Sequence, residues 1–380
     1  MSRFAALKSA LAFAVALGPV AQAAAAPRSC PGPSGANVPL SRLGSPRPHL
    51  LLDENFPDPY IARFEGAFYG YATGNQIGGG QMNVQVVRSS DLRRWTRPAE
   101  AFPATNLPGW VDKVHPQVWA PEVMRIGGRY VLYFNARHAV LTRTEIGRDG
   151  ARVLQRHCIG AAVADRPDGP FTGIDAPLVC AELPDGAIDA HVFSDEAAGG
   201  ALYLYYKLDS NCCGGGSEIH VQGLSTDGLA ALGPAIRLVA NNDSPGTEDD
   251  WEWRVVEAPT MVRRGPAYFL FYSGNFFGNR NYSVAYLKCA SPRGPCTDLG
   301  ENPILWSHKE TDLVGPGHQS LMDWKGRTYL FFHGWNEDPD AREQPGVHKR
   351  CLYAGRVNWV RGPDGERPVI AGGEPVVAPE

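Results

Sequence analysis

Hydrophobic and aromatic residues are concentrated in five short segments that share one layout, a glycine turn followed by an apolar strand. These segments are residues 66–72 (GAFYGYA), 128–134 (GRYVLYF), 200–206 (GALYLYY), 265–272 (GPAYFLFY) and 326–332 (GRTYLFF). Aromatic and β-branched runs bounded by turn residues predict half-buried or fully buried β-strands. The segments recur every 60 to 70 residues or so, a spacing suited to four-stranded blades with their loops.

Turn sequences follow most of these strands and complete the repeat. They are residues 89–92 (SSDL), 164–170 (ADRPDGP), 225–228 (STDG) and 290–295 (ASPRGP). Asp-Gly and Gly-Pro pairs favour tight turns. Five such units predict an all-β fold, a single five-bladed β-propeller, in which radial closure protects the strand edges. An aromatic-rich β-sandwich is the alternative.

The N-terminal residues have the pattern of an export signal. Arg3 and Lys8 precede an apolar run at residues 10–20, and residues 21–23 (AQA) form a small-x-small cleavage site. We expect a signal peptide at 1–26, an irregular lead-in at 27–49 and the propeller domain at 50–380. The run is too short to span a bilayer. A first helix of the folded domain is the alternative, although nothing polar gives the run a solvent-facing side. The pattern predicts a secreted or periplasmic protein without a membrane anchor.

The eight cysteines all follow this segment, and an even number in an exported protein favours disulfide bonds. Cys158 with Cys180 and Cys289 with Cys296 are close enough in sequence to pair locally. Cys30 with Cys351 could join the two ends, and Cys212 with Cys213 could form a vicinal bridge or belong to two bridges. Zinc is the competing interpretation, although no Cys-x-x-Cys pair is present.

Composition narrows the choice of partner. The net charge is -4 and no basic stripe interrupts the mixture of acids and bases, so a nucleic acid partner is not expected. The 43 glycines and 32 prolines fit a turn-rich β fold, because these residues punctuate short strands. We expect a monomer.

Three segments each place one carboxylate just ahead of an apolar strand. They are residues 56–60 (FPDPY), 187–191 (AIDAH) and 256–260 (VEAPT), which contain Asp58, Asp189 and Glu257. At the start of a blade's innermost strand, such a side chain points into the mouth of the central channel. Two carboxyl groups about 6.5 to 9.5 Å apart, one activating water and one protonating the leaving oxygen, hydrolyse a glycosidic bond with inversion. Glu257 can be the acid if a neighbouring negative charge raises its pKa.

Aromatic rings near these carboxylates are candidates for stacking on a sugar. By position they are Trp119, Phe56 and Trp251, of which Trp119 is favoured because propeller aromatics are mostly core residues. Glu122 is expected to be structural, and His191 and His333 to be packed or hydrogen-bonded. The acids at 248–252 are expected to form a solvated loop that could also border the cleft.

The chain from about residue 50 onward resembles glycoside hydrolase family 43, whose members are five-bladed propellers that act mainly on arabinofuranosides and β-xylosides. The matching segments, in order, are residues 57–60 (PDPY), 119–122 (WAPE), 188–190 (IDA), 257–260 (EAPT), 315–318 (GPGH) and a closing strand from Arg350 to Trp359. Ala190 and Ala258 stand where the family more commonly has Pro and Gly, so backbone angles could differ there.

The resemblance implies a role for each site residue. Asp58 would be the general base, Glu257 the general acid and Asp189 the residue that keeps Glu257 protonated. Arg350 would reach both the bound sugar and the acid. His318 would sit in the central channel and contact an ion, usually calcium, largely through waters; a purely structural role is the alternative, because calcium prefers oxygen ligands. No organic cofactor is implied.

The implied activity is that of an inverting, exo-acting α-L-arabinofuranosidase on arabinose- or xylose-containing plant polysaccharides or their oligosaccharides. β-Xylosidase or endo-arabinanase activity on the same scaffold remains open, because the shape of the cleft depends on its loops. A related propeller family that acts on fructosides with retention fits poorly, because residues 188–190 and 257–258 lack its Arg-Asp-Pro and Glu-Cys segments. A non-catalytic glycan-binding propeller is the alternative from another class, although all three carboxylates are present.

Overall fold

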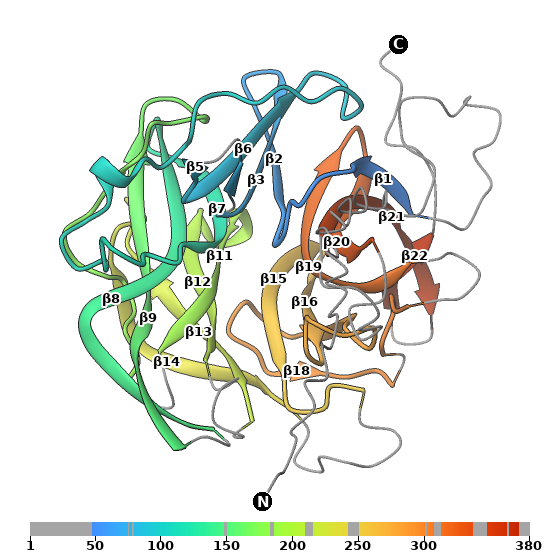
Figure 1. The fold of residues 1–380 in the computed structure, drawn as a ribbon. Helices are drawn as coiled ribbons and strands as arrows, with labels where there is room; N and C mark the ends of the chain where they lie inside the picture. Colours follow the sequence, from blue (N-terminus) through green and yellow to red (C-terminus); the bar gives the residue numbers. More distant parts are fainter. Residues whose placement is uncertain are drawn as a thin grey trace, which may run out of the picture.

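The computed structural model describes residues 48–371, apart from residues 75, 78–79, 148–149, 183–185, 210–215, 242–250, 301, 308–312, 337–347 and 363–364. Five antiparallel sheets are arranged around one axis, which confirms the predicted five-bladed propeller (Figure 1). The predicted signal and all but the last two residues of the lead-in lie outside the described residues. No helix in the described ranges is long and apolar enough to cross a membrane.

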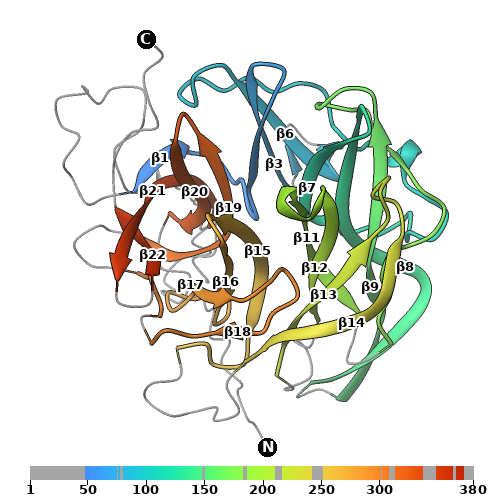
Figure 2. The same ribbon diagram turned by 180° about the vertical axis from the view of Figure 1, so that it is seen from behind.

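The innermost strands of the five blades are β2 (Tyr60–Phe64), β7 (Trp119–Ile126), β11 (Ala187–Asp195), β15 (Val256–Arg264) and β19 (Val314–Trp324). Each contacts the innermost strand of the next blade, and β19 returns to β2, so they close a ring around the axis. Figure 2 shows the same arrangement from behind.

The aromatic segments found in the sequence form the second strands, β3 (Ala67–Thr73), β8 (Arg129–Gly147), β12 (Ala201–Leu208), β16 (Ala267–Gly274) and β20 (Arg327–Trp335). Each pairs with the innermost strand of its own blade. The glycine that begins each segment has a positive φ, between 56° and 86°. This left-handed conformation suits glycine and allows the tight turn between the two strands.

The outer strands complete the blades. The third strands are β6 (Val84–Ser89), β9 (Gly150–Ala164), β13 (Glu218–Leu224), β17 (Ser283–Cys289) and β21 (Arg350–Gly362). Beyond them lie β10 (Thr172–Gly173), β14 (Ala231–Ala240), β18 (Cys296–Thr297) and, both paired with β21, β1 (His49–Leu52) and β22 (Gly365–Ala371). A separate hairpin consists of β4 (Gln76–Ile77) and β5 (Gly80–Gln81). Because β1 joins the last blade, the two ends of the domain are held in one sheet.

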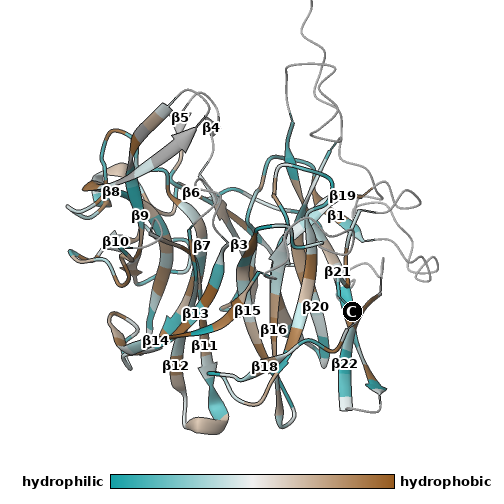
Figure 3. Ribbon diagram, turned by 90° about the horizontal axis from the view of Figure 1, so that it is seen from below, coloured by the Kyte–Doolittle hydropathy of each residue, from teal (hydrophilic) through white to brown (hydrophobic). Residues whose placement is uncertain are grey.

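Apolar side chains fill the spaces between neighbouring blades. The described residues form five buried clusters, one for each pair of adjacent blades, and each cluster draws residues from both blades. Figure 3 shows hydrophobic residues interspersed along the strands of the blades. Packing both faces of a blade against its neighbours explains why the aromatic segments of the second strands have apolar residues at consecutive rather than alternate positions.

Candidate active site

Each blade has a left-handed residue at the same place, in its innermost strand or just ahead of it. The five residues are Asp58, Ala120, Asp189, Ala258 and His318, with φ between 45° and 57°. In four blades the residue lies in a β-bulge, where the strand register shifts; Asp58 lies just ahead of β2. A bulge breaks the alternation of a strand and redirects its side chains. This repeated feature directs Asp58 and Asp189, and Glu257 beside Ala258, toward the axis.

A ring of buried polar residues on the second strands supports these bulges. Its members are Thr73, Asn135, Lys207, Ser273 and His333, none more than 7% exposed. Four of them accept a hydrogen bond from the backbone N–H of the next blade's bulge residue: Thr73 from Ala120 at 2.9 Å, Asn135 from Asp189 at 3.3 Å, Ser273 from His318 at 2.9 Å and His333 from Asp58 at 3.2 Å. Satisfying these buried donors fixes the backbone of the site.

The three predicted carboxylates meet in one cavity of about 140 Å³. It is lined by Asp58, Thr73, Trp119, Ile188, Asp189, Glu257, Phe277, His318 and Arg350. The described strands thus bring together residues up to 292 positions apart in the sequence, as in the Arg350–Asp58 pair.

Asp58 is surrounded by donors. Its Oδ1 accepts from Arg350 Nη1 at 2.9 Å, and its Oδ2 accepts from the Thr73 hydroxyl. Burial alone would raise the pKa of Asp58, but the Arg350 guanidinium, His318, His333 and Thr73 outweigh burial and hold the pKa well below its usual value. Asp58 is therefore an ionised carboxylate over the whole physiological range, as a base must be.

Glu257 is also held by two donors. Lys207 Nζ lies 2.7 Å from its Oε2, and the Tyr282 hydroxyl donates to its Oε1 at 2.7 Å. Burial acts to raise the pKa of Glu257, yet Lys207 and then Tyr282 lower it overall. The expectation that a neighbouring negative charge raises this pKa is wrong, because the ammonium group of Lys207 and the Tyr282 hydroxyl outweigh burial, the largest effect in the opposite direction.

The raised pKa falls on Asp189 instead. Its Oδ2 accepts the backbone N–H of Ala258 at 3.0 Å. Burial, opposed by His318 and reinforced by the negative charge of Glu257, raises the pKa of Asp189 to about 6. Two interacting carboxyl groups titrate as a pair, so the Asp189–Glu257 pair holds one proton in the mildly acidic range.

Of the three predicted substrate contacts, Trp119 and Arg350 line the cavity and Phe56 does not. Trp119 lines the cavity, with its ring stacked on His157 at 4.0 Å. Arg350 also lines it, but pairs with Asp58, the predicted base, rather than with the acid; its guanidinium lies over the Phe277 ring at 5.0 Å. Phe56 was wrongly predicted to face a sugar: it is 0% exposed and packs in the core between the first and last blades.

Other sequence expectations concern supporting residues. Glu122 is hydrogen-bonded to His191, with Oε2 and Nδ1 2.9 Å apart, as expected for structural residues. Trp251 packs near Tyr272 at 5.8 Å between ring centroids. The acids Glu248, Asp249 and Asp250 lie outside the described residues. Glu252 was wrongly expected to be solvated: it is buried and accepts from the Tyr272 hydroxyl at 2.6 Å.

Several site residues escaped the sequence analysis, namely Thr73, Phe277, Tyr282 and Lys207. Thr73 and Lys207 end apolar strand segments, where a polar residue is ordinarily the start of a loop. The usable signal was position: Thr73 and Lys207 each come seven residues after the glycine of their segment, as Asn135 and His333 do, and Ser273 comes eight after its own.

The surroundings of His318 do not fit the expected calcium ion. His318 Nδ1 faces Asp58 Oδ1 at 3.4 Å, and the adjoining space on the axis is about 10 Å³, room for about one water. Calcium takes six to eight oxygen ligands. Within the described ranges no group of three or more His, Cys, Asp or Glu side chains could hold a metal ion.

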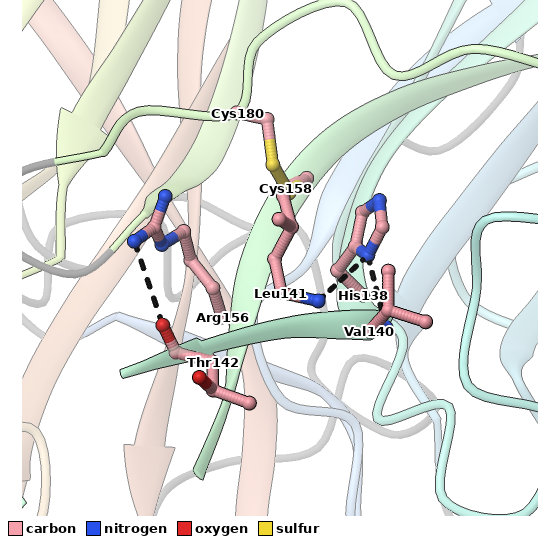
Figure 4. Close-up of a disulfide and its surroundings, with 7 residues drawn as sticks. All are labelled: His138, Val140, Leu141, Thr142, Arg156, Cys158 and Cys180. Atoms are coloured by element: carbon pink, nitrogen blue, oxygen red, sulfur yellow. Dashed lines mark hydrogen bonds between the residues drawn. A yellow bond between two sulfur atoms is a disulfide. The ribbon is translucent and has the colours of Figure 1, made fainter. Parts of the chain in front are cut away.

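Two of the expected disulfides are present. Cys158–Cys180 joins β9 to the segment after β10 (Figure 4), and Cys289–Cys296 joins β17 to β18. In Figure 4 a nearby irregularity within β8, where its register with β9 shifts, is held by His138 Nδ1, which accepts from the backbone N–H groups of Val140 and Leu141. Cys30, Cys212 and Cys213 lie outside the described residues.

A five-bladed propeller with three carboxylates in one cavity at its axis defines the class of glycoside-hydrolase propellers. A family model described as glycosyl hydrolases family 43 matches residues 50–362. The chain therefore belongs to glycosyl hydrolases family 43, whose enzymes need no organic cofactor.

Curated relatives have mixed specificities. A β-D-galactofuranosidase, xynD, from Aspergillus niger is 24% identical over 302 residues, which cover 76% of each chain. Xylosidase/arabinosidase 43A from Humicola insolens is 29% identical over 59% of this chain and 67% of its own. Among solved structures, a thermostable family-43 glycoside hydrolase superposes with a TM-score of 0.67 at 26% identity, covering 86% of this chain and 95% of the other.

Proposed function

We propose that this glycoside hydrolase is an inverting, exo-acting α-L-arabinofuranosidase that removes arabinose from plant cell-wall arabinan or arabinoxylan. The observation that carries the proposal is the cavity in which Asp58, Asp189 and Glu257 meet Arg350 and Trp119. Its small volume supports recognition of a single terminal sugar. Relatives named as arabinosidases and exo-arabinofuranosidases support the same substrate class.

In the proposed reaction, the ionised Asp58 takes a proton from a water molecule while the oxygen of that water attacks the anomeric carbon. The glycosidic bond breaks and Glu257 gives its proton to the leaving oxygen. The active form is thus the one in which Asp58 is ionised and the proton shared by Asp189 and Glu257 resides on Glu257. Arg350 orients Asp58, and Trp119 offers a ring face to the sugar. No step is assigned to calcium, since the residues near His318 do not fit it.

A β-D-galactofuranosidase is a second candidate, because the relative from Aspergillus niger bears that name and matches 76% of the chain. The three activities are distinguished by the kcat/KM values for aryl α-L-arabinofuranoside, aryl β-D-galactofuranoside and aryl β-D-xylopyranoside. We expect the arabinofuranoside to be preferred, and proton NMR to show the β-anomer of arabinose first. Preference for the xyloside, or the α-anomer first, would contradict the proposal.

We also propose that the protein is exported as a monomer, with residues 1–26 as its signal, 27–49 as a lead-in and 50–380 as the catalytic domain. The two described disulfides support an oxidising compartment. N-terminal sequencing of the protein recovered outside the cytoplasm should begin between Ala24 and Pro27. Recovery with residues 1–26 intact would argue against a cleaved signal.

A further inference from the structure

Lys207 is the exception in the ring of buried polar residues that supports the bulges. At the four other positions the ring residue accepts a hydrogen bond from the next blade's bulge N–H. An ammonium group has three donors and no acceptor, so Lys207 cannot do the same for Ala258. The Ala258 N–H donates to Asp189 Oδ2 instead, at 3.0 Å. Lys207 in the third blade thus leaves the Ala258 N–H of the fourth blade to pair with Asp189 rather than with the supporting ring.

The ammonium group of Lys207 forms a buried ion pair with Glu257. Lys207 is 0% exposed, and its Nζ lies 2.7 Å from Glu257 Oε2. Tyr282 occupies the other carboxylate oxygen of Glu257 at 2.7 Å. With a donor on each oxygen, the carboxylate form of Glu257 is stabilised and its orientation is fixed.

Charges from several elements act on this pair. Asp209 after β12, Asp189 on β11 and Glu257 on β15 are the acids near Lys207; because they outweigh burial, they raise its pKa and keep it charged. His318 on β19 and Tyr282 act on Glu257 in the same direction as Lys207. Of these groups, Lys207 lowers the pKa of Glu257 the most.

We propose that Lys207 is a positioning residue for the general acid: it orients Glu257, favours its carboxylate form and so limits hydrolysis to the acidic side of neutrality. The inference rests on the proposed function of Glu257. A positive charge next to a carboxyl group lowers the pH at which that group loses its proton. The alkaline limb of the kcat/KM profile reports the essential acid of the free enzyme, so this limb carries the effect of Lys207.

The test is the pH dependence of kcat/KM for an aryl arabinofuranoside with the full-length enzyme. In Lys207→Gln we expect the alkaline limb to move to higher pH by about one unit or more. The acidic limb, set by Asp58, should stay in place. Lys207→Arg keeps the charge and should keep the parent's limb. Lys207→Met also removes the charge but retains the aliphatic stem. It should show the same shift, and it serves as the test if Lys207→Gln folds poorly.

Tyr205→Phe is a matched control for loss of a buried polar group. Tyr205 lies two residues away on β12 and donates to the Pro292 carbonyl at 2.6 Å, away from the carboxylates. Its substitution should leave the limb where it is. If both Lys207→Gln and Lys207→Met lose activity equally at every pH, with no movement of the limb, Lys207 is only structural and the inference is wrong.

The two proposals fail separately. If Glu257→Gln is inactive on substrates with poor leaving groups but neither neutral Lys207 variant moves the limb, the role of Lys207 is overturned while the proposed function stands. If Glu257→Gln hydrolyses such substrates as fast as the parent, the assignment of the acid fails first.

Discussion

At the scale of single residues, the three carboxylates are distinguished by the charges and donors around each. Asp58 faces a guanidinium and Glu257 faces an ammonium group. Asp189 accepts a backbone N–H, and its burial, with the nearby charge of Glu257, outweighs the attraction of His318 and Lys207. Their pKa values are therefore lowered, lowered and raised, respectively. Environment, rather than residue type, gives each carboxylate its proposed role.

The raised pKa of Asp189 predicts how stability depends on pH. The folded protein binds this proton more tightly than the unfolded chain, because the pKa rises from 3.8 to about 6. Asp189 thus stabilises the fold at low pH, and that contribution is lost as the pH rises through about 6. Asp189→Asn keeps an oxygen that can accept the Ala258 N–H but cannot ionise. We expect its stability relative to the parent to improve by about 1–3 kcal/mol between pH 4 and pH 8.

Urea unfolding of both proteins at the two pH values measures this difference. A constant difference between variant and parent would show that Asp189 does not carry the raised pKa. Activity of the variant should fall at every pH, since the proton-sharing pair is lost.

At the scale of elements, the bulges of the innermost strands create the site, and the sequence reveals them poorly. The second strands were found because each contains a run of consecutive aromatic and aliphatic residues, whereas the innermost strands mix polar and apolar residues. Phe56 and Asp58 are two residues apart and would share a face of a regular strand. The left-handed backbone of Asp58 breaks that alternation, so the carboxylate faces the cavity while Phe56 enters the core. The sequence motifs were enough to locate the three carboxylates. Their hydrogen-bond partners could not be predicted, because they depend on the left-handed residues and bulges of the innermost strands.

Gly317 shows how tightly a bulge fits its neighbours. A Cβ at this position would overlap the ring of Tyr282, which donates to Glu257. We expect Gly317→Ala to destabilise the protein by about 1–3 kcal/mol through overpacking. It should also lower kcat/KM, because Tyr282 is displaced from Glu257. Thermal unfolding and steady-state kinetics measure the two effects.

Gly223→Ala on β13 is the control, since its added methyl group would meet only Leu232, at 3.4 Å or more. It should leave both quantities nearly unchanged. Parent-like kinetics in Gly317→Ala would mean that Tyr282 is not needed for the acid.

At the scale of the whole molecule, closure of the propeller depends on β1. This strand pairs with β21 in the last blade and buries Leu50 and Leu51 in two different inter-blade clusters. The five-bladed form was predictable from the repeat of aromatic strands. The contribution of β1 was not, because residues 49–52 (HLLL) lack the glycine turn that marks the other units.

Removal of β1 should open the last blade. A chain that lacks residues 1–52 is expected to be less stable than one that lacks residues 1–47 by about 3–6 kcal/mol, the value of burying two leucine side chains. Comparing these two truncations isolates β1, because both lack the same preceding residues. Equal melting temperatures would show that the ring closes without this strand.

The central claim is that Asp58 and Glu257 perform the proton transfers of hydrolysis as base and acid. The most direct test compares Asp58→Asn and Glu257→Gln on two aryl arabinofuranosides, one with a 2,4-dinitrophenyl and one with a 4-methoxyphenyl leaving group. A dinitrophenolate departs without protonation, so Glu257→Gln should retain most of the parent's kcat on it and lose about 10²–10⁴-fold on the methoxyphenyl substrate. Asp58→Asn should lose activity on both. Equal losses for Glu257→Gln on the two substrates, or an active Asp58→Asn, would contradict the account.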